Sequence, residues 1–178
     1  MGLFQWALTL ALAGAMTSPS PGPGQQASKV TRIVIHKAAH TMELQGKEGG
    51  ATTYPVSLGN GGAGFKRREG DRVTPVGRYH VLNRGSSQFT IFMRLDYPNA
   101  EDRKRFAKLK AEGALPKGAT IGGDIGIHGG TPEGWNKRPD ATNAERDWTL
   151  GCIGVEDDEI RAIARRVPDG TVVDIDDE

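Results

Sequence analysis

The chain has 178 residues, and its 23 Lys or Arg nearly balance its 22 Asp or Glu, giving a formal net charge of +1. A chain so close to neutral lacks the strong positive field of proteins that bind nucleic acid or anionic membranes, so we expect no nucleic-acid partner. A single cysteine excludes an intramolecular disulfide and leaves too few ligands for a cysteine-rich zinc site. The 25 glycines and 10 prolines favour turns and short strands over long helices.

The N-terminus begins with an apolar run, MGLFQWALTLALAGA, which is too short to span a bilayer alone. It resembles the hydrophobic region of a secretory signal peptide, and Ala13-Gly14-Ala15 fits an A-x-A cleavage site. No Lys or Arg precedes the run, so an uncleaved anchor and a wrongly assigned start codon stay open as alternatives. We expect residues 1–15 to be a signal peptide and the protein to be exported, either to the periplasm or to the cell wall.

Residues 16–28 are dominated by Pro, Gly and Ser, a composition typical of an extended linker with nothing to bury. The folded domain is therefore expected to span residues 29–178. Within it, β-branched and apolar runs predict strands at 30–36, 52–58, 77–82, 89–95, 125–128, 152–155 and 171–175. A turn is expected at 83–85.

Two helices are expected beside these strands. Residues 99–112 form one, with Phe106 and Leu109 three positions apart and Gly113 as its stop. The other begins at Asp157 or Asp158 and places Ile160, Ile163 and Val167 on one face. Since strands outnumber helices, the expected fold class is mainly β with two peripheral helices.

Charge is distributed unevenly along the chain. Residues 62–110 hold twelve Lys or Arg and five acids, whereas residues 140–178 hold twelve acids and four Arg. Two solvated faces would explain this pattern. Alternatively, the stretch from Lys66 to Arg78, which includes Arg72, lies near a site that receives carboxylate-bearing substrates, because guanidinium groups match carboxylates.

Cys152 is the candidate nucleophile, although a lone cysteine can also be a small buried hydrophobe. An exported protein has little reason to keep a free thiol, and Gly151 before it allows close approach of backbone to a ligand. A thiol nucleophile needs a partner that lowers its pKa or accepts its proton. Among four histidines, His128 ends an apolar strand and opens into two glycines, which makes it the candidate base; a structural histidine is the alternative. The histidines lack metal-site spacing.

These motifs together resemble a known family. IGIHGG at 125–130 and DWTLGCIGV at 147–155 are similar to the His-Gly and Ser/Thr-x-Gly-Cys signature of the L,D-transpeptidase catalytic (YkuD-like) domain. FKRREGDRVTPVGRYHV at 65–81 resembles the family's K-x-x-G-D-x-x-T-P-x-G-x-Y segment, and YPNAEDRKRF at 97–106 resembles the periplasmic ErfK/YafK-type branch. The resemblance covers about residues 30–176.

The resemblance implies packed, sandwich-like β-sheets, with the site in a cleft beneath a flap. It implies that Cys152 is the nucleophile and His128 the base, with the carbonyl of Gly129 orienting the imidazole. It further implies an oxyanion hole at the N–H groups of Gly151 and Cys152, with Thr149 at the Ser/Thr position of the motif. No metal or organic cofactor is implied, since thiolate, imidazole and backbone donors suffice.

Two positions depart from the family pattern and bear on substrate choice. Leu150 stands where relatives often carry His, and Gly154 stands where many carry Arg. The stretch 131–146 is extended and is expected to form a lid, with Trp135 as its apolar anchor and Trp148 as the surface on which it closes. Alternatively, Trp135 pins a surface loop. Lys66, Arg72, Trp135 and Trp148 are thus the candidate substrate-binding residues.

The resemblance also implies peptidoglycan as the substrate, so we expect an acyl-transfer enzyme that acts on stem peptides through a thioester at Cys152, with release of D-Ala. The acceptor is expected to be the amine of another stem peptide or a lysine of a wall-attached protein. A hydrolase of the same fold, an amidase or carboxypeptidase that uses water as acceptor, is the alternative. An inactive wall-binding module is a third reading, which intact Cys152 and His128 argue against.

Overall fold

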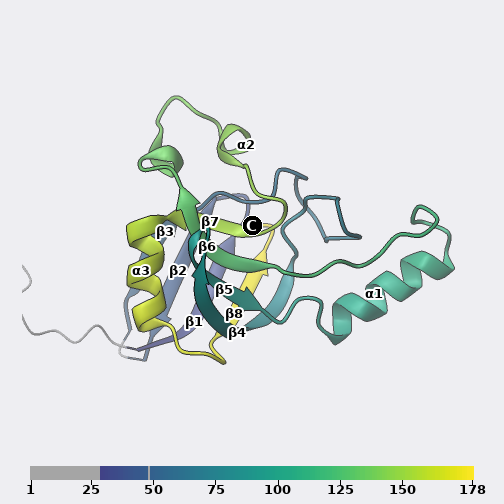
Figure 1. Ribbon diagram of the computed structural model, residues 1–178, viewed down its shortest axis with the longest axis horizontal. Helices are drawn as coiled ribbons and strands as arrows, with labels where there is room; N and C mark the ends of the chain where they lie inside the picture. Colours follow the sequence, from purple (N-terminus) through teal and green to yellow (C-terminus); the bar gives the residue numbers. More distant parts are fainter. Residues whose placement is uncertain (1–28, 48) are drawn as a thin grey trace, which may run out of the picture.

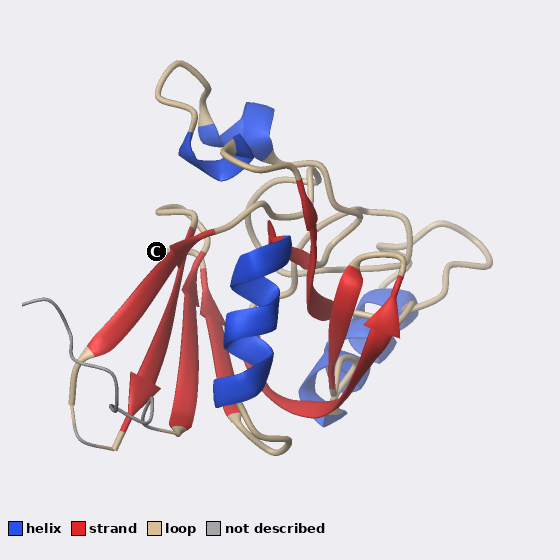
Figure 2. Cartoon of the chain, turned by 60° about the vertical axis from the view of Figure 1, so that its left-hand side comes forward, coloured by secondary structure: helices blue, strands red, loops and turns tan. Residues whose placement is uncertain are grey.

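A single curved β-sheet dominates the chain (Figures 1 and 2). The computed structural model describes residues 29–47 and 49–178, so the expected signal peptide and linker lie outside the described residues. The eight strands are ordered β3-β2-β1-β8-β4-β5-β6-β7. They are β1 (Val30–His36), β2 (Thr41–Gly46), β3 (Ala51–Pro55), β4 (Gly77–Ser87), β5 (Thr90–Leu95), β6 (Gly126–Thr131), β7 (Ile153–Glu156) and β8 (Val172–Asp176). The expected mainly β fold class is confirmed.

The two ends of this sheet meet, so it is nearly closed. Ser57, which follows β3, exchanges both backbone hydrogen bonds with Gly154 of β7, at N···O distances of 2.9 and 2.8 Å. Neighbouring strands are antiparallel except for the β1–β8 and β6–β7 pairs. A register shift between Val81 and Asn83 bends the long strand β4, which belongs to both halves of the sheet. The closure fixes the edge of β7, next to Cys152.

Three strand predictions needed correction. Strand β2 was not expected, because its alternation is short; it buries Met42 and Leu44 and pairs with β1. The strand expected at 52–58 ends at Pro55, since the residues after it form the closure instead of a ladder. The turn expected at 83–85 lies beyond Ser87. Strand β4 continues to Ser87 because its backbone pairs with β5. Its last residues are polar and do not alternate with buried apolar residues, so the sequence does not mark them as a strand.

The helices lie outside the sheet. Helix α1 (Ala100–Ala111) projects from the body, is capped by Asn99, and buries Asp102, which accepts a hydrogen bond from the Tyr79 hydroxyl at 3.1 Å (Figure 1). Helix α3 (Asp157–Arg166) packs on β5, β6 and β7 and buries Ile160 and Ile163 as expected. Its N-cap is Glu156, one residue before the expected Asp157, because the strand β7 runs directly into the helix.

One segment departs from the body between β6 and β7. It contains the 3-10 turn η1 (Trp135–Lys137) and the short helix α2 (Asn143–Arg146). Within the described residues, no helix is long and apolar enough to cross a membrane.

Candidate active site

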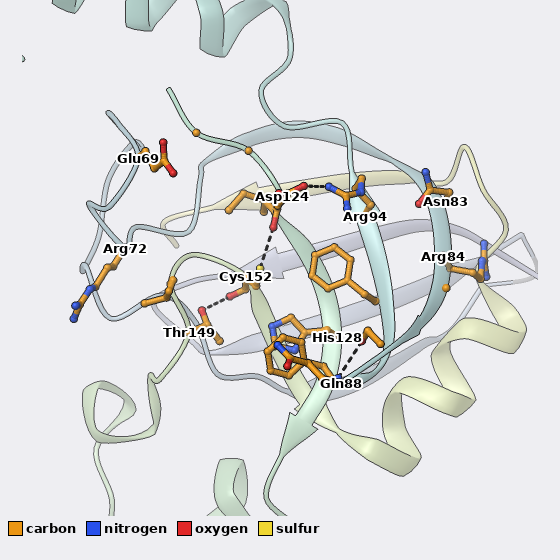
Figure 3. A pocket seen from close by; sticks show the side chains of 18 of the residues that line it. Glu69, Arg72, Asn83, Arg84, Gln88, Arg94, Asp124, His128, Thr149 and Cys152 are labelled. Atoms are coloured by element: carbon orange, nitrogen blue, oxygen red, sulfur yellow. Dashed lines mark hydrogen bonds and ion pairs between the residues drawn. The ribbon is translucent and has the colours of Figure 1, made fainter. Parts of the chain in front are cut away.

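His128 of β6 and Cys152, which directly precedes β7, project from the same face of the sheet. Parallel strands β6 and β7 place Ile127 beside Ile153 and His128 beside Gly154. Cys152 directly precedes Ile153, so it lies beside Gly126, two positions from His128. Side chains two positions apart on a strand share a face. Both residues line one cleft of about 1110 Å³ (Figure 3).

The surroundings of His128 favour its neutral imidazole. Its side chain is buried, and its Nδ1 lies 2.6 Å from the carbonyl oxygen of Gly129. A carbonyl only accepts hydrogen bonds, so Nδ1 carries the proton and Nε2 is left as the basic nitrogen. Burial lowers the pKa of His128, and the Gly129 carbonyl offsets this only in part. The placement of Gly129 matches the orienting role that the family resemblance implies.

Aromatic rings surround this imidazole. Phe89 stacks on it with ring centroids 4.5 Å apart, Phe92 lies at 5.8 Å, and Trp148 meets it edge-on at 5.6 Å. The Phe89 carbonyl also accepts the Gly129 N–H at 3.1 Å. These contacts fix the ring orientation and exclude water from one side of it, which accounts for the low pKa.

The environment of Cys152 favours the protonated thiol. Burial raises the pKa of Cys152, while the Gly126 N–H and the charges of Lys66 and Arg94 act in the opposite direction. The Sγ–H donates to the carbonyl of Asp124 at 3.5 Å. A protonated thiol and a neutral imidazole that line the same cleft suit proton transfer during nucleophilic attack rather than a preformed ion pair.

The loop that carries Cys152 is held by Thr149. The buried Thr149 hydroxyl donates to the Cys152 carbonyl at 2.7 Å and accepts the Gly151 N–H at 3.2 Å. Gly151 has a φ of +131°, and a Cβ there would lie 3.0 Å from the Val73 carbonyl oxygen, so the position requires glycine. The Gly151 N–H is engaged by Thr149, and the oxyanion hole at Gly151 and Cys152 stays a prediction.

Three of the four candidate substrate-binding residues line the cleft: Lys66, Arg72 and Trp148. Lys66 is buried, and its Nζ lies 2.6 Å from Asp71 Oδ1. Its charge is therefore largely partnered within the protein.

Trp135 lies outside the cleft. Its indole N–H donates to the Arg146 carbonyl at 2.9 Å, and the Arg138 guanidinium stacks 3.9 Å above its ring. Buried Asn136 ties the segment to Ser57 Oγ at 2.6 Å, over the closure of the sheet. The stretch 131–146 therefore packs away from Cys152 and does not form the expected lid. The alternative, that Trp135 pins a surface loop, fits the contacts.

Arg94 and Asp124 are among the polar residues of the cleft that sequence reasoning missed. They form an ion pair beside Cys152 (Figure 3). The sequence holds a weak signal for each residue. Arg94 lies two positions after Phe92 in a predicted strand, so both share a face, and Asp124 follows Gly122-Gly123 just before the His128 strand. Within residues 29–47 and 49–178, no group of three or more His, Cys, Asp or Glu is placed to hold a metal ion.

The nearly closed β-sheet thus presents Cys152 and His128 to one cleft. The sequence model of the L,D-transpeptidase catalytic domain (YkuD) matches residues 30–175. The chain belongs to this family.

Solved structures share the fold at low sequence identity. Bd1075 from Bdellovibrio bacteriovorus is 22% identical with a TM-score of 0.54, and the match covers 85% of this chain and 49% of that one. The helical cell shape determining protein Pgp2 from Campylobacter jejuni is 22% identical, with a TM-score of 0.57 and coverages of 85% and 48%. A cysteine variant of the Enterococcus faecium L,D-transpeptidase is 14% identical, with a TM-score of 0.53 and coverages of 84% and 50%. The chain thus matches about half the length of these proteins. No curated protein sequence matches it.

Proposed function

We propose that this chain is an L,D-transpeptidase that forms a thioester between Cys152 and a peptidoglycan stem peptide. The observation that carries the proposal is the shared face of Cys152 and His128, with Nδ1 of His128 committed to Gly129. That arrangement leaves a basic nitrogen and a thiol in one cleft, and these are the two side-chain groups that nucleophilic acyl transfer requires.

The reaction starts from the neutral pair. His128 Nε2 takes the thiol proton while Sγ of Cys152 attacks the carbonyl between a dibasic residue and the terminal D-Ala. The C–N bond then breaks, His128 returns the proton to the departing amine, and D-Ala leaves. In the second half, an acceptor amine gives its proton to His128 and attacks the thioester, which releases the Cys152 thiol.

The acceptor decides between transferase and hydrolase. We propose the amine of a second stem peptide, with a lysine of a wall-attached protein as the alternative amine. A specific observation favours water as a competing acceptor: the stretch 131–146, expected to exclude water, packs outside the cleft. An amidase or carboxypeptidase activity is therefore the second candidate function.

The proposal includes export, because peptidoglycan lies outside the cytoplasm. The expected signal peptide at residues 1–15 supports this, and the location is the periplasm or the cell wall.

Product analysis tests the proposal. Purified tetrapeptide muropeptides are incubated with the protein and with the Cys152→Ala variant, and the products are resolved by mass spectrometry. We expect cross-linked dimers and free D-Ala with the unmodified protein and neither with the variant. Tripeptide without dimers would support the hydrolase, whereas D-Ala release by Cys152→Ala at more than about a tenth of the normal rate would overturn the thiol mechanism.

A further inference from the structure

Asp124 holds two functional groups of the cleft at once. Its carboxylate pairs with the Arg94 guanidinium, and its main-chain carbonyl accepts the Cys152 Sγ–H at 3.5 Å. Figure 3 shows the continuous chain of contacts from Arg94 through Asp124 to Cys152. A single residue of the protein therefore presents a carboxylate and a carbonyl to the groups that face the cleft.

The sheet register places Arg94 in line with the nucleophile. Arg94 of β5 pairs with Gly126 of β6, and Gly126 lies beside Cys152. Antiparallel partners and parallel partners both point to a common face, so the guanidinium and the thiol project to the same side. Gly126 contributes no side chain between them. The backbones of Arg94 and Cys152 are about 10 Å apart across the sheet, which is two strand spacings.

Another carboxylate could replace that of Asp124 on Arg94, because Asp124 is open to solvent. Its side chain is 81% exposed, and its φ of +55° is a conformation that side-chain-bearing residues adopt reluctantly. Gly122, with φ of +77°, and Gly123 precede it, and glycine adopts backbone conformations that other residues avoid. Among the described residues, Asp124 is the sole ionic partner of Arg94.

We propose that Arg94 recognises a carboxylate of the acyl donor and that Asp124 occupies this subsite when the donor is absent. The donor carboxylate replaces the Asp124 carboxylate on Arg94. With its anchor lost, the Asp124 carbonyl leaves the thiol, and the scissile carbonyl of the donor takes its place. This inference rests on the proposed function for the donor's identity, and it adds a specificity-determining residue and the chemistry it selects.

The ligand class is a peptide with a free carboxylate next to the scissile amide. A stem peptide carries one at its terminal D-Ala, and a second on the side chain of the dibasic residue where that residue is a diamino dicarboxylic acid. Both are recognised by the same guanidinium chemistry, so donors amidated at one carboxylate or the other distinguish them.

The first test needs no peptide substrate. Iodoacetate and iodoacetamide both alkylate a thiolate with loss of iodide, but only iodoacetate carries a carboxylate. The ratio of their rate constants at Cys152 reports carboxylate recognition, whereas changes in thiolate fraction cancel. We expect Arg94→Gln to lower the ratio about tenfold, the usual weight of a charge-assisted hydrogen bond. We expect Asp124→Asn to raise it, because the competing carboxylate is gone.

A matched control separates recognition from net charge. Arg84 also lines the cleft, but it is bound to Asp169 at 2.5 Å and to the Ala164 carbonyl at 2.6 Å. Arg84→Gln removes the same charge, and we expect it to leave the ratio near that of the unmodified protein. Arg94→Lys keeps the charge, so we expect its ratio of iodoacetate to iodoacetamide rate constants to lie between those of the unmodified protein and Arg94→Gln. This variant also provides a test if Arg94→Gln folds poorly. An unchanged ratio in Arg94→Gln, or an equal loss in Arg84→Gln, would overturn the proposal.

The second test uses peptide donors. We expect amidation of the recognised carboxylate to raise KM about tenfold in the unmodified protein and to have little effect in Arg94→Gln. The carboxylate whose amidation has this effect is the one bound. Equal KM values for all three donors in the unmodified protein would overturn the proposal. If no stem peptide is turned over, the proposed function fails, while the alkylation ratio still decides the role of Arg94.

Discussion

Replacing Thr149 by valine removes the hydroxyl that holds the loop carrying Cys152 and changes little else. The Thr149 side chain is 3% exposed, donates to the Cys152 carbonyl at 2.7 Å and accepts the Gly151 N–H at 3.2 Å. Valine has a similar shape but leaves both groups without this partner. Each such loss costs about 1 to 2 kcal/mol when the group stays desolvated, so Thr149→Val should lower the free energy of unfolding by about 2 to 4 kcal/mol.

Urea unfolding measures this loss, and Thr149→Ser is the matched control because it keeps the hydroxyl. We expect the serine variant to lose less than half as much stability. Turnover of Thr149→Val should fall roughly 10- to 100-fold, because small displacements of a nucleophile are costly. A valine variant within about 0.5 kcal/mol of the unmodified protein and with normal turnover would refute the positioning role of Thr149.

Three further predictions concern the base and the loop. In Gly129→Ala, the new Cβ would lie 2.6 Å from Asp157 Oδ1, so thermal unfolding should show a loss of about 1 to 3 kcal/mol together with impaired turnover; an unchanged melting temperature would contradict this. The lowered pKa of His128 means that the imidazole stays neutral below its ordinary value of about 6.5, so turnover should persist there and fall only as the pH drops through the lowered value. If turnover falls on the acidic side with a midpoint at or above about pH 6.5, or if His128→Gln leaves this pH dependence unaltered, His128 is not the proton acceptor. Trp135→Ala should leave the ratio of hydrolysis to aminolysis unchanged, because Trp135 lies outside the cleft; a shifted ratio would restore the lid.

The family and the fold class could be predicted because short motifs carry them. The glycines around His128 and Cys152 are required by backbone geometry, so they mark the motif in the sequence. At Gly129, a Cβ would overlap the Asp157 and Ile160 side chains, and at Gly151 it would crowd the Val73 carbonyl. Such constraints are local, and a sequence displays them directly.

The rest of the site depends on contacts between distant segments. Arg94 and Cys152 are 58 positions apart, and only the pairing of β5 with β6 and of β6 with β7 brings them into one row. The extended stretch 131–146 is compatible with a lid in the sequence. Where it packs is decided by the hydrogen bond of buried Asn136 to Ser57 across the sheet closure. Neither the register nor that closure has a signature in the sequence.

The proposed mechanism requires that a stem peptide becomes covalently attached to Cys152. Intact-mass measurement of the protein, mixed with a tetrapeptide muropeptide and quenched in acid, detects this attachment. We expect one adduct per chain with the mass of the donor less D-Ala, absent from Cys152→Ala and formed more slowly by His128→Gln. D-Ala released at the normal rate by Cys152→Ala, or an adduct on that variant, would contradict it.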